Sequence, residues 1–246
     1  MSGTDAGEPN APASFDAYAA ARDDAAFTDW LRARAEPDWT AVVTHPLARD
    51  LCSGDLDDEA FRRYLVQDYA VVETLVGAFG RAIGAAPTMD AKSSLAEFVA
   101  VLTDDYFERA FAALGVADSE RAAPDLTPTT RAFEDLLERA GREGGYPETL
   151  AVLVPAEWVY FEWAAAADGD PDRFYLAEWV DLHATDAFAE FVAWLRRELD
   201  REGAAASPRR RRRLDRLFRR TTELEAAFFT AAFDEEATPT EGGRRW

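Results

Sequence analysis

Three carboxylates interrupt the apolar stripes of three separate segments of this 246-residue chain. In the segment FRRYLVQDYAVVETLVGAF, Asp68 stands at a stripe position with apolar residues before and after it. Glu157 takes the same place in TLAVLVPAEWVYFEWAAA, and Glu225 lies on the stripe that leads to Phe228. Burying an ionised carboxylate is costly, so these acids need either arginine partners or a polar cavity. The aromatic residues around all three favour a cavity.

A proline adds a second signal beside one of these acids. Pro155 lies inside a helical pattern, where it removes one backbone hydrogen bond and predicts a kink directly before Ala156 and Glu157. Such a kink either borders a functional site or fits the helix around its neighbours. The proline by itself favours neither interpretation.

Residues that could hold a metal or a cofactor are scarce. Cys52 is the only cysteine, which excludes an internal disulfide and a thiolate metal cluster. The only histidines, His45 and His183, are too few for a carboxylate-histidine dimetal bundle. No glycine-rich phosphate loop is present. We therefore expect no metal and no cofactor. The arginine run at 209–213 could contact an anion or an acidic neighbour, but at a helix start it more often forms a solvated face.

The chain between the termini has helical periodicity and no convincing strand. Glycines stand where helices should end, at Gly54 and Gly115, and Thr127 and Ser207 each precede a proline as N-caps. The predicted helices span 14–35, 40–52, 57–85, 89–114, 128–142, 147–168, 171–183, 186–203 and 208–234. We expect an all-α fold, a compact multi-helix bundle in one domain at 14–235, with flexible tails at 1–13 and 236–246.

Composition narrows the classes of function. Acidic residues number 47 against 27 basic ones, the net charge is -20, and Lys92 is the only lysine. An acidic surface of this kind indicates a protein adapted to high salt, and it disfavours nucleic-acid binding. The start of the chain lacks a signal-peptide pattern, and no apolar run is long enough to span a bilayer. We expect a cytoplasmic protein without a membrane or nucleic-acid partner.

Several stretches together resemble one known family. They are THPLARDLCSGDLDDEAFRRYLVQDYAVV, LAVLVPAEWVYFEWA, the segment LAEWVDLHATDAFAEFV and the final TTELEAAFFTAAF, which occur in the right order across residues 40–234. The chain is similar in these stretches to the TenA family, also called thiaminase II. The resemblance implies a haem-oxygenase-like helical bundle, usually a homotetramer, that hydrolyses thiamin-derived aminopyrimidines in thiamin salvage.

The resemblance also assigns roles to individual residues. Asp68 matches the aspartate that binds the pyrimidine, and Glu225 matches the glutamate that handles protons. Ala156 stands at the position of the family's cysteine nucleophile, so the usual covalent route is closed. Substitutions at further pocket positions leave the substrate open: Val71, Phe133, His183 and Phe107 all fall at or near tyrosine, other aromatic or histidine positions. The chain is similar to a subgroup that lacks the cysteine and uses glutamates, and its acidity suggests a haloarchaeal member.

These observations predict hydrolysis of a carbon–nitrogen bond in an aminomethyl- or formylaminomethyl-pyrimidine. Glu225 is expected to be the general acid and Glu157 the general base. Asp68 would hold the amidine-like edge of the ring, and aromatic residues would cover its face. The substrate-binding residues are predicted to be Asp68, Tyr64, Tyr160, Phe133, His183 and Phe228. Two other interpretations stay open: a cofactor-free oxidase related to quinone-biosynthesis proteins, and a non-catalytic pyrimidine-binding or regulatory protein.

Overall fold

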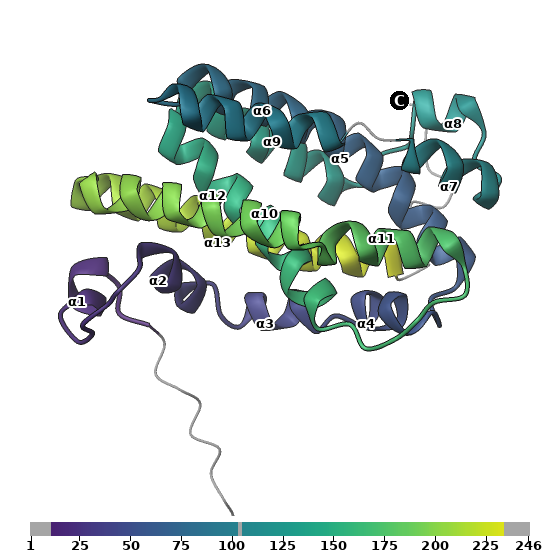
Figure 1. The fold of residues 1–246 in the computed structure, drawn as a ribbon, viewed down its shortest axis with the longest axis horizontal. Coiled ribbons are helices and arrows are strands. Elements are labelled where there is room, and N and C mark those ends of the chain that lie inside the picture. Colours follow the sequence, from purple (N-terminus) through teal and green to yellow (C-terminus); the bar gives the residue numbers. More distant parts are fainter. Residues whose placement is uncertain (1–10, 103–104, 234–246) are drawn as a thin grey trace, which may run out of the picture.

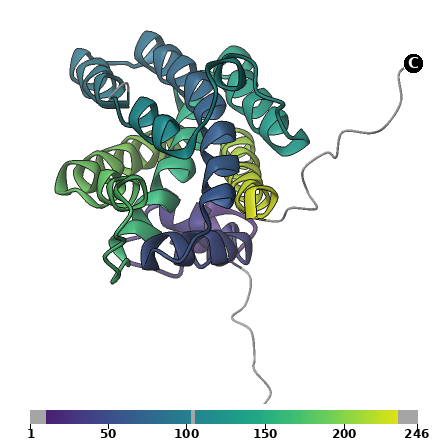
Figure 2. The same ribbon diagram turned by 90° about the vertical axis from the view of Figure 1, so that its right-hand side faces the viewer.

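The computed structural model describes residues 11–102 and 105–233, and these residues contain helices and no strand. Figure 1 shows long helices stacked in layers, and Figure 2 shows them end-on around a common interior. The prediction of an all-α bundle is confirmed. The helices are α1 (Phe15–Ala19), α2 (Phe27–Arg34), α3 (Asp38–Val43), α4 (Pro46–Ser53), α5 (Asp58–Ala85), α6 (Met89–Leu102), α7 (Tyr106–Leu114), α8 (Asp118–Ala122), α9 (Pro128–Glu143), α10 (Tyr146–Ala165), α11 (Phe174–Ala184), α12 (Asp186–Ala205) and α13 (Pro208–Phe233).

Helix α10 is the central element. It packs against α5, α9, α11, α12 and α13. Nearly all of its residues are buried, including Glu157 and the proline at position 155 inside the helix. A helix that is apolar on every side is expected at the centre of a bundle, where no face meets water. Any polar side chain in its middle therefore points into the protein interior.

The predicted helix ends at glycines and N-caps are confirmed. Gly54 and Gly115 have positive φ angles of 79° and 69° and end α4 and α7. The Thr127 side chain accepts a hydrogen bond from the backbone N–H of Thr130 at the start of α9. The hydroxyl of Ser207 likewise accepts from the backbone N–H of Arg210 at 3.3 Å. These caps satisfy backbone groups that a helix end leaves without partners.

Three predicted helices were wrong in extent. The range 14–35 divides into α1 and α2, and 40–52 divides into α3 and α4 because Pro46 occupies the first turn of α4 and His45 has extended backbone before it. The range 89–114 divides into α6 and α7, with residues 103–104 outside the described part. The short α8 was not predicted.

The predicted tails fall mostly outside the described residues, which exclude 1–10 and 234–246. Pro12, within the predicted N-terminal tail, is held in place because its carbonyl accepts a 2.8 Å hydrogen bond from Trp30 Nε1. No helix in the described ranges has the length and apolar character needed to cross a membrane.

Candidate active site

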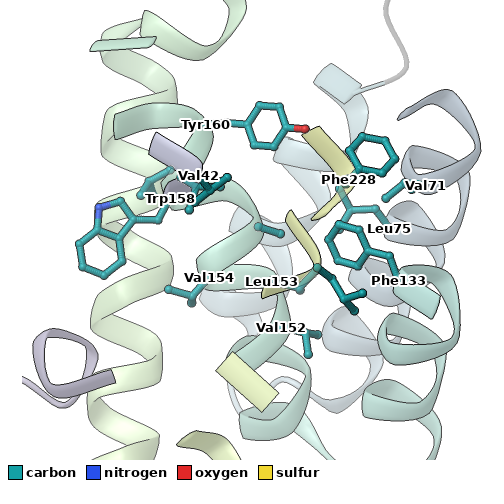
Figure 3. Close-up of a cluster of buried hydrophobic side chains, with 14 of the residues drawn as sticks. Val42, Val71, Leu75, Phe133, Val152, Leu153, Val154, Trp158, Tyr160 and Phe228 are labelled. Carbon is teal, nitrogen blue, oxygen red and sulfur yellow. The ribbon is translucent and has the colours of Figure 1, made fainter. Parts of the chain in front are cut away.

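A cavity of about 550 Å³ is lined by residues of α5, α6, α7, α9, α10, α11, α12 and α13. Its wall is mainly apolar and aromatic. Figure 3 shows Val71, Leu75, Phe133 and Phe228 gathered side by side at this wall, with Trp158 pointing away on the other side of α10. The predicted site residues that line the cavity are Asp68, Phe133, Glu157, Tyr160, His183, Glu225 and Phe228. These seven predicted residues come from five helices, α5, α9, α10, α11 and α13.

The Asp68 carboxylate is held in place by hydrogen bonds from two tyrosines. Its Oδ1 accepts hydrogen bonds from the hydroxyls of Tyr64, at 3.1 Å, and Tyr160, at 3.3 Å. The two hydroxyl oxygens are 2.8 Å apart. Asp68 Oδ2 is buried and has no partner among the described residues. The tyrosines thus fix the carboxylate and leave one oxygen available to a ligand.

The position of Tyr64 differs from the prediction. Tyr64 was expected to cover the face of the pyrimidine, but it does not line the cavity. Tyr64 lies four residues before Asp68 on α5, and side chains four residues apart on a helix are neighbours. Its hydroxyl donates a hydrogen bond to the Asp68 carboxylate. Tyr64 therefore positions the Asp68 carboxylate and does not itself form the wall.

Among the described residues, Glu157 and Glu225 have no partner that would stabilise a charge. Both side chains are buried, with exposed fractions of 5% and 2%. Glu157 Oε1 and Glu225 Oε2 make no hydrogen bond within the described ranges. Buried polar atoms normally have partners, and exceptions are common where a ligand binds. Two unsatisfied carboxyl groups at one cavity therefore indicate a functional site.

Other buried acids show what a structural carboxylate looks like in this protein. Glu148 is bound by Arg210 at 2.7 Å. Asp215 is bound by Arg34 at 3.4 Å. The three buried acids of the cavity, Asp68, Glu157 and Glu225, form no ion pair with an arginine in the described part of the chain, although arginines are abundant and Arg197 also lines the cavity. The alternative that these three acids are structural ion pairs is therefore wrong.

Burial and mutual repulsion set the ionisation of the three acids. Burial raises the pKa of Asp68 to about 7, against the hydrogen bonds from the two tyrosines. Burial, and then the charge of Asp68, raises the pKa of Glu157 to about 8. Burial, followed by the charges of Asp68 and Glu157, holds the pKa of Glu225 well above its usual range. Neighbouring carboxylates cannot all ionise together, so they lose their protons in sequence.

His183 is neutral and has a defined tautomer. Its Nδ1 lies 2.7 Å from the carbonyl oxygen of Trp179, which can only accept, so Nδ1 carries the proton. Burial lowers the pKa of His183 to about 4. The remaining nitrogen, Nε2, is then a hydrogen-bond acceptor at the cavity wall.

Some lining residues were missed from the sequence. Trp179, Tyr106 and Phe188 line the cavity beside His183, and the Trp179 and His183 rings are 4.7 Å apart. The spacing of four between Trp179 and His183 on one helix could have indicated a shared face. Phe107 and Val71, noted as substituted positions, also line the cavity. Ala156 lies beside them in the wall, so the place of the missing thiol opens onto the cavity.

Metal binding finds no support in these side chains. Within the ranges 11–102 and 105–233, no group of three or more histidine, cysteine, aspartate or glutamate residues could hold a metal ion.

This protein is an all-helical bundle with a carboxylate-lined cavity beside its central helix, α10. Residues 32–235 match the TENA/THI-4/PQQC family, and the chain belongs to it. It is 28% identical over 85% of its length to an aminopyrimidine aminohydrolase of Halalkalibacterium halodurans, covering 96% of that protein, and 25% identical over 68% to one of Bacillus subtilis, covering 72%. A solved structure described as a TenA family transcription regulator, from Silicibacter sp. TM1040, matches with a TM-score of 0.75 and 24% identity over 84% of this chain and 96% of that one. The predicted family membership is confirmed.

Proposed function

We propose that this protein hydrolyses a carbon–nitrogen bond of a thiamin-derived aminopyrimidine, and that it does so with carboxylates and without a cysteine nucleophile. The observation that carries the proposal is the grouping in one cavity of three buried carboxyl groups that form no ion pair among the described residues. The relatives named aminopyrimidine aminohydrolase support the reaction class. Ala156 in the cavity wall has no side chain able to form a covalent intermediate.

Asp68 is proposed to bind the ring. An aminopyrimidine presents an amino N–H beside a ring nitrogen, and a carboxylate can pair with both when that nitrogen is protonated. Tyr64 and Tyr160 hold Oδ1 of Asp68, and Oδ2 is left for the ligand. Phe228 and Phe133, whose rings are 6.4 Å apart, supply apolar area for the ring's faces.

Glu157 and Glu225 are proposed to divide the proton transfers. Burial and the charges of Asp68 and Glu157 raise the pKa of Glu225, whereas burial and the charge of Asp68 alone raise the pKa of Glu157, so Glu225 is the last of the three to ionise. Glu157 takes a proton from water as the water oxygen bonds to the methylene carbon of the substrate. Glu225 gives its proton to the leaving nitrogen as the carbon–nitrogen bond breaks. An aminomethyl substrate then yields the hydroxymethyl pyrimidine and ammonia.

His183 is proposed to contact the leaving group or the ring edge. Because Nδ1 donates to the Trp179 carbonyl, Nε2 can only accept, and it fits a substrate N–H. A tyrosine hydroxyl could both donate and accept at such a position. The histidine therefore restricts the cavity to ligands that present a donor here.

The direct test is product analysis. Purified protein is incubated with aminomethyl- and formylaminomethyl-pyrimidine at low salt and at molar salt, and the hydroxymethyl pyrimidine, ammonia and formate are measured. The proposal expects the hydroxymethyl pyrimidine from at least one substrate. Tight binding of the pyrimidine without any product would instead support a binding or regulatory protein.

The assembly is proposed from the family, and the location from the sequence pattern. We propose a homotetramer that acts in the cytoplasm on a small-molecule substrate. Light scattering of the purified chain tests the assembly, and a monomer at micromolar concentration would contradict it.

A further inference from the structure

A second concave surface lies between the C-terminal half of α9 and the N-terminal half of α13, away from the carboxylate cavity. We call it the arginine groove. Three glutamates and seven arginines line it, together with small and apolar residues: Glu143, Glu148, Glu223, Arg139, Arg209, Arg210, Arg213, Arg216, Arg219 and Arg220. The groove is therefore locally basic on a chain whose net charge is -20.

Some of these arginines have a structural role. Arg210 binds both oxygens of the buried Glu148, at 3.1 and 2.7 Å, and thereby fastens α13 to the start of α10. Arg213 donates to the carbonyl oxygen of Glu143 at 3.3 Å. Arg220 pairs with Glu223 at 3.0 Å along the same helix. These contacts account for three of the seven guanidinium groups.

The other four guanidinium groups have no such role. Arg139, Arg209, Arg216 and Arg219 form no ion pair within residues 11–102 and 105–233. Acids outnumber bases 47 to 27 in this chain, and Arg211 of the same helix pairs with Asp16 at 2.6 Å. Gathering four unpaired cations in one groove is electrostatically unfavourable unless an anion neutralises them.

We propose that the arginine groove binds a small molecule that carries two or three linked phosphates. The free arginines on α13 extend from Arg209 to Arg219, which corresponds to about 15 Å along the helix at 1.5 Å per residue. Arg139 faces them from α9. Guanidinium groups bind phosphate oxygens in pairs, so cations spread along a groove match several linked phosphates better than one.

The groove recognises the phosphates and not the rest of the ligand. Its apolar lining is limited to Leu136, Ala140 and Leu217, and no aromatic residue is present on which a base could stack. A nucleoside triphosphate and inorganic tripolyphosphate should therefore bind with similar affinity. An extended acidic peptide carries one negative charge per side chain, and its carboxylates stand farther apart than linked phosphates do, so it should bind more weakly.

Isothermal titration calorimetry of the full-length protein at 0.15 M salt tests this site with four probes: tripolyphosphate, ATP, orthophosphate and a polyglutamate peptide. We expect tripolyphosphate and ATP to bind alike and orthophosphate at least about tenfold more weakly. The double variant Arg216→Ala with Arg219→Ala should weaken tripolyphosphate binding by at least about tenfold. It removes no ion pair, so folding should be retained, which circular dichroism checks.

A matched control removes two arginines elsewhere. Arg49 and Arg131 are exposed, and their partners are the nearby surface acids Asp50 and Asp125. The variant Arg49→Ala with Arg131→Ala changes the net charge equally and should bind tripolyphosphate as the parent does. Absence of tripolyphosphate binding, an equal loss in both double variants, or tighter binding of the peptide than of tripolyphosphate would overturn the proposal. None of these results depends on the hydrolytic activity.

Discussion

Replacing Glu157 by glutamine should make the protein more stable at neutral pH. Burial and the Asp68 charge raise the pKa of Glu157 from 4.5 to about 8 in the folded state. Between these values the unfolded chain has lost the proton and the folded chain has kept it, so stability falls as pH rises. Each pH unit costs ~1.4 kcal/mol, which gives ~3 kcal/mol at pH 7. Glutamine is uncharged and removes this cost.

Thermal or urea unfolding of both proteins at pH 5 and pH 7 measures the effect. Glutamine alters local hydrogen bonding at every pH, so the informative quantity is the change in the difference between the two proteins across that range. At pH 5 the expected gain is below ~1 kcal/mol, and at pH 7 it should be ~3 kcal/mol, a rise in Tm of about 6–12 °C for a chain of this size.

A matched control has the opposite sign. Glu148 is also buried, but its bonds to Arg210 lower its pKa below 4.5 despite burial. Its stabilising effect is present above that pH and lost as pH falls through the folded-state pKa, so Glu148→Gln should destabilise the protein at pH 7. If Glu157→Gln also lost stability between pH 5 and pH 7, Glu157 would be a paired structural carboxylate and the reasoning would be refuted.

Three further predictions concern the same site and surface. Asp68→Asn should raise KM strongly, because an amide cannot pair with a protonated ring edge, while the tyrosine hydroxyls can still donate to its Oδ1; unchanged KM would contradict the binding role. In the free enzyme, kcat/KM should rise by at least about tenfold per pH unit from pH 6, because both Asp68, with a pKa of about 7, and Glu157, with a pKa of about 8, must lose a proton, and it should level off above pH 8; a profile already flat at pH 6 would rule out Glu157 as the base. Tm should rise between low and molar salt, since screening weakens repulsion in a chain of net charge -20, and a salt-independent Tm would argue against adaptation to high salt.

The fold could be predicted from the sequence to the extent that it depends on local signals. Gly54, Gly115 and Thr127 mark helix ends because their requirements are met within a few residues of the chain. The break before Pro46 was also a local signal, but it was overlooked within a long apolar pattern. The short α8 has no buried residue, so its sequence has no apolar periodicity that would predict a helix.

The site could be predicted only along single helices. Stripe positions identified Asp68, Glu157 and Glu225, each of which lines the cavity. The hydrogen bond between the hydroxyls of Tyr64 and Tyr160 depends on how α5 and α10 are aligned. The sequence pattern of a single helix carries no information about that alignment. The arginine groove likewise arises from the packing of α9 on α13, and the run at 209–213 proved to be partly ion-paired rather than uniformly solvated. The functional roles of these residues remain predictions.

In the proposed mechanism, carboxylates transfer protons and no covalent intermediate forms. A single-turnover reaction in ¹⁸O-labelled water tests this mechanism most directly. Excess protein is mixed with the aminomethyl pyrimidine, and the hydroxymethyl product and the digested protein are analysed by mass spectrometry. If Glu157 activates water, the new hydroxyl carries ¹⁸O and the Glu157 peptide is unlabelled. If Glu157 instead attacked the carbon and its ester were hydrolysed at the acyl carbon, the product would carry ordinary oxygen and the label would appear in Glu157. That second pattern, or the absence of product, would contradict the proposed mechanism.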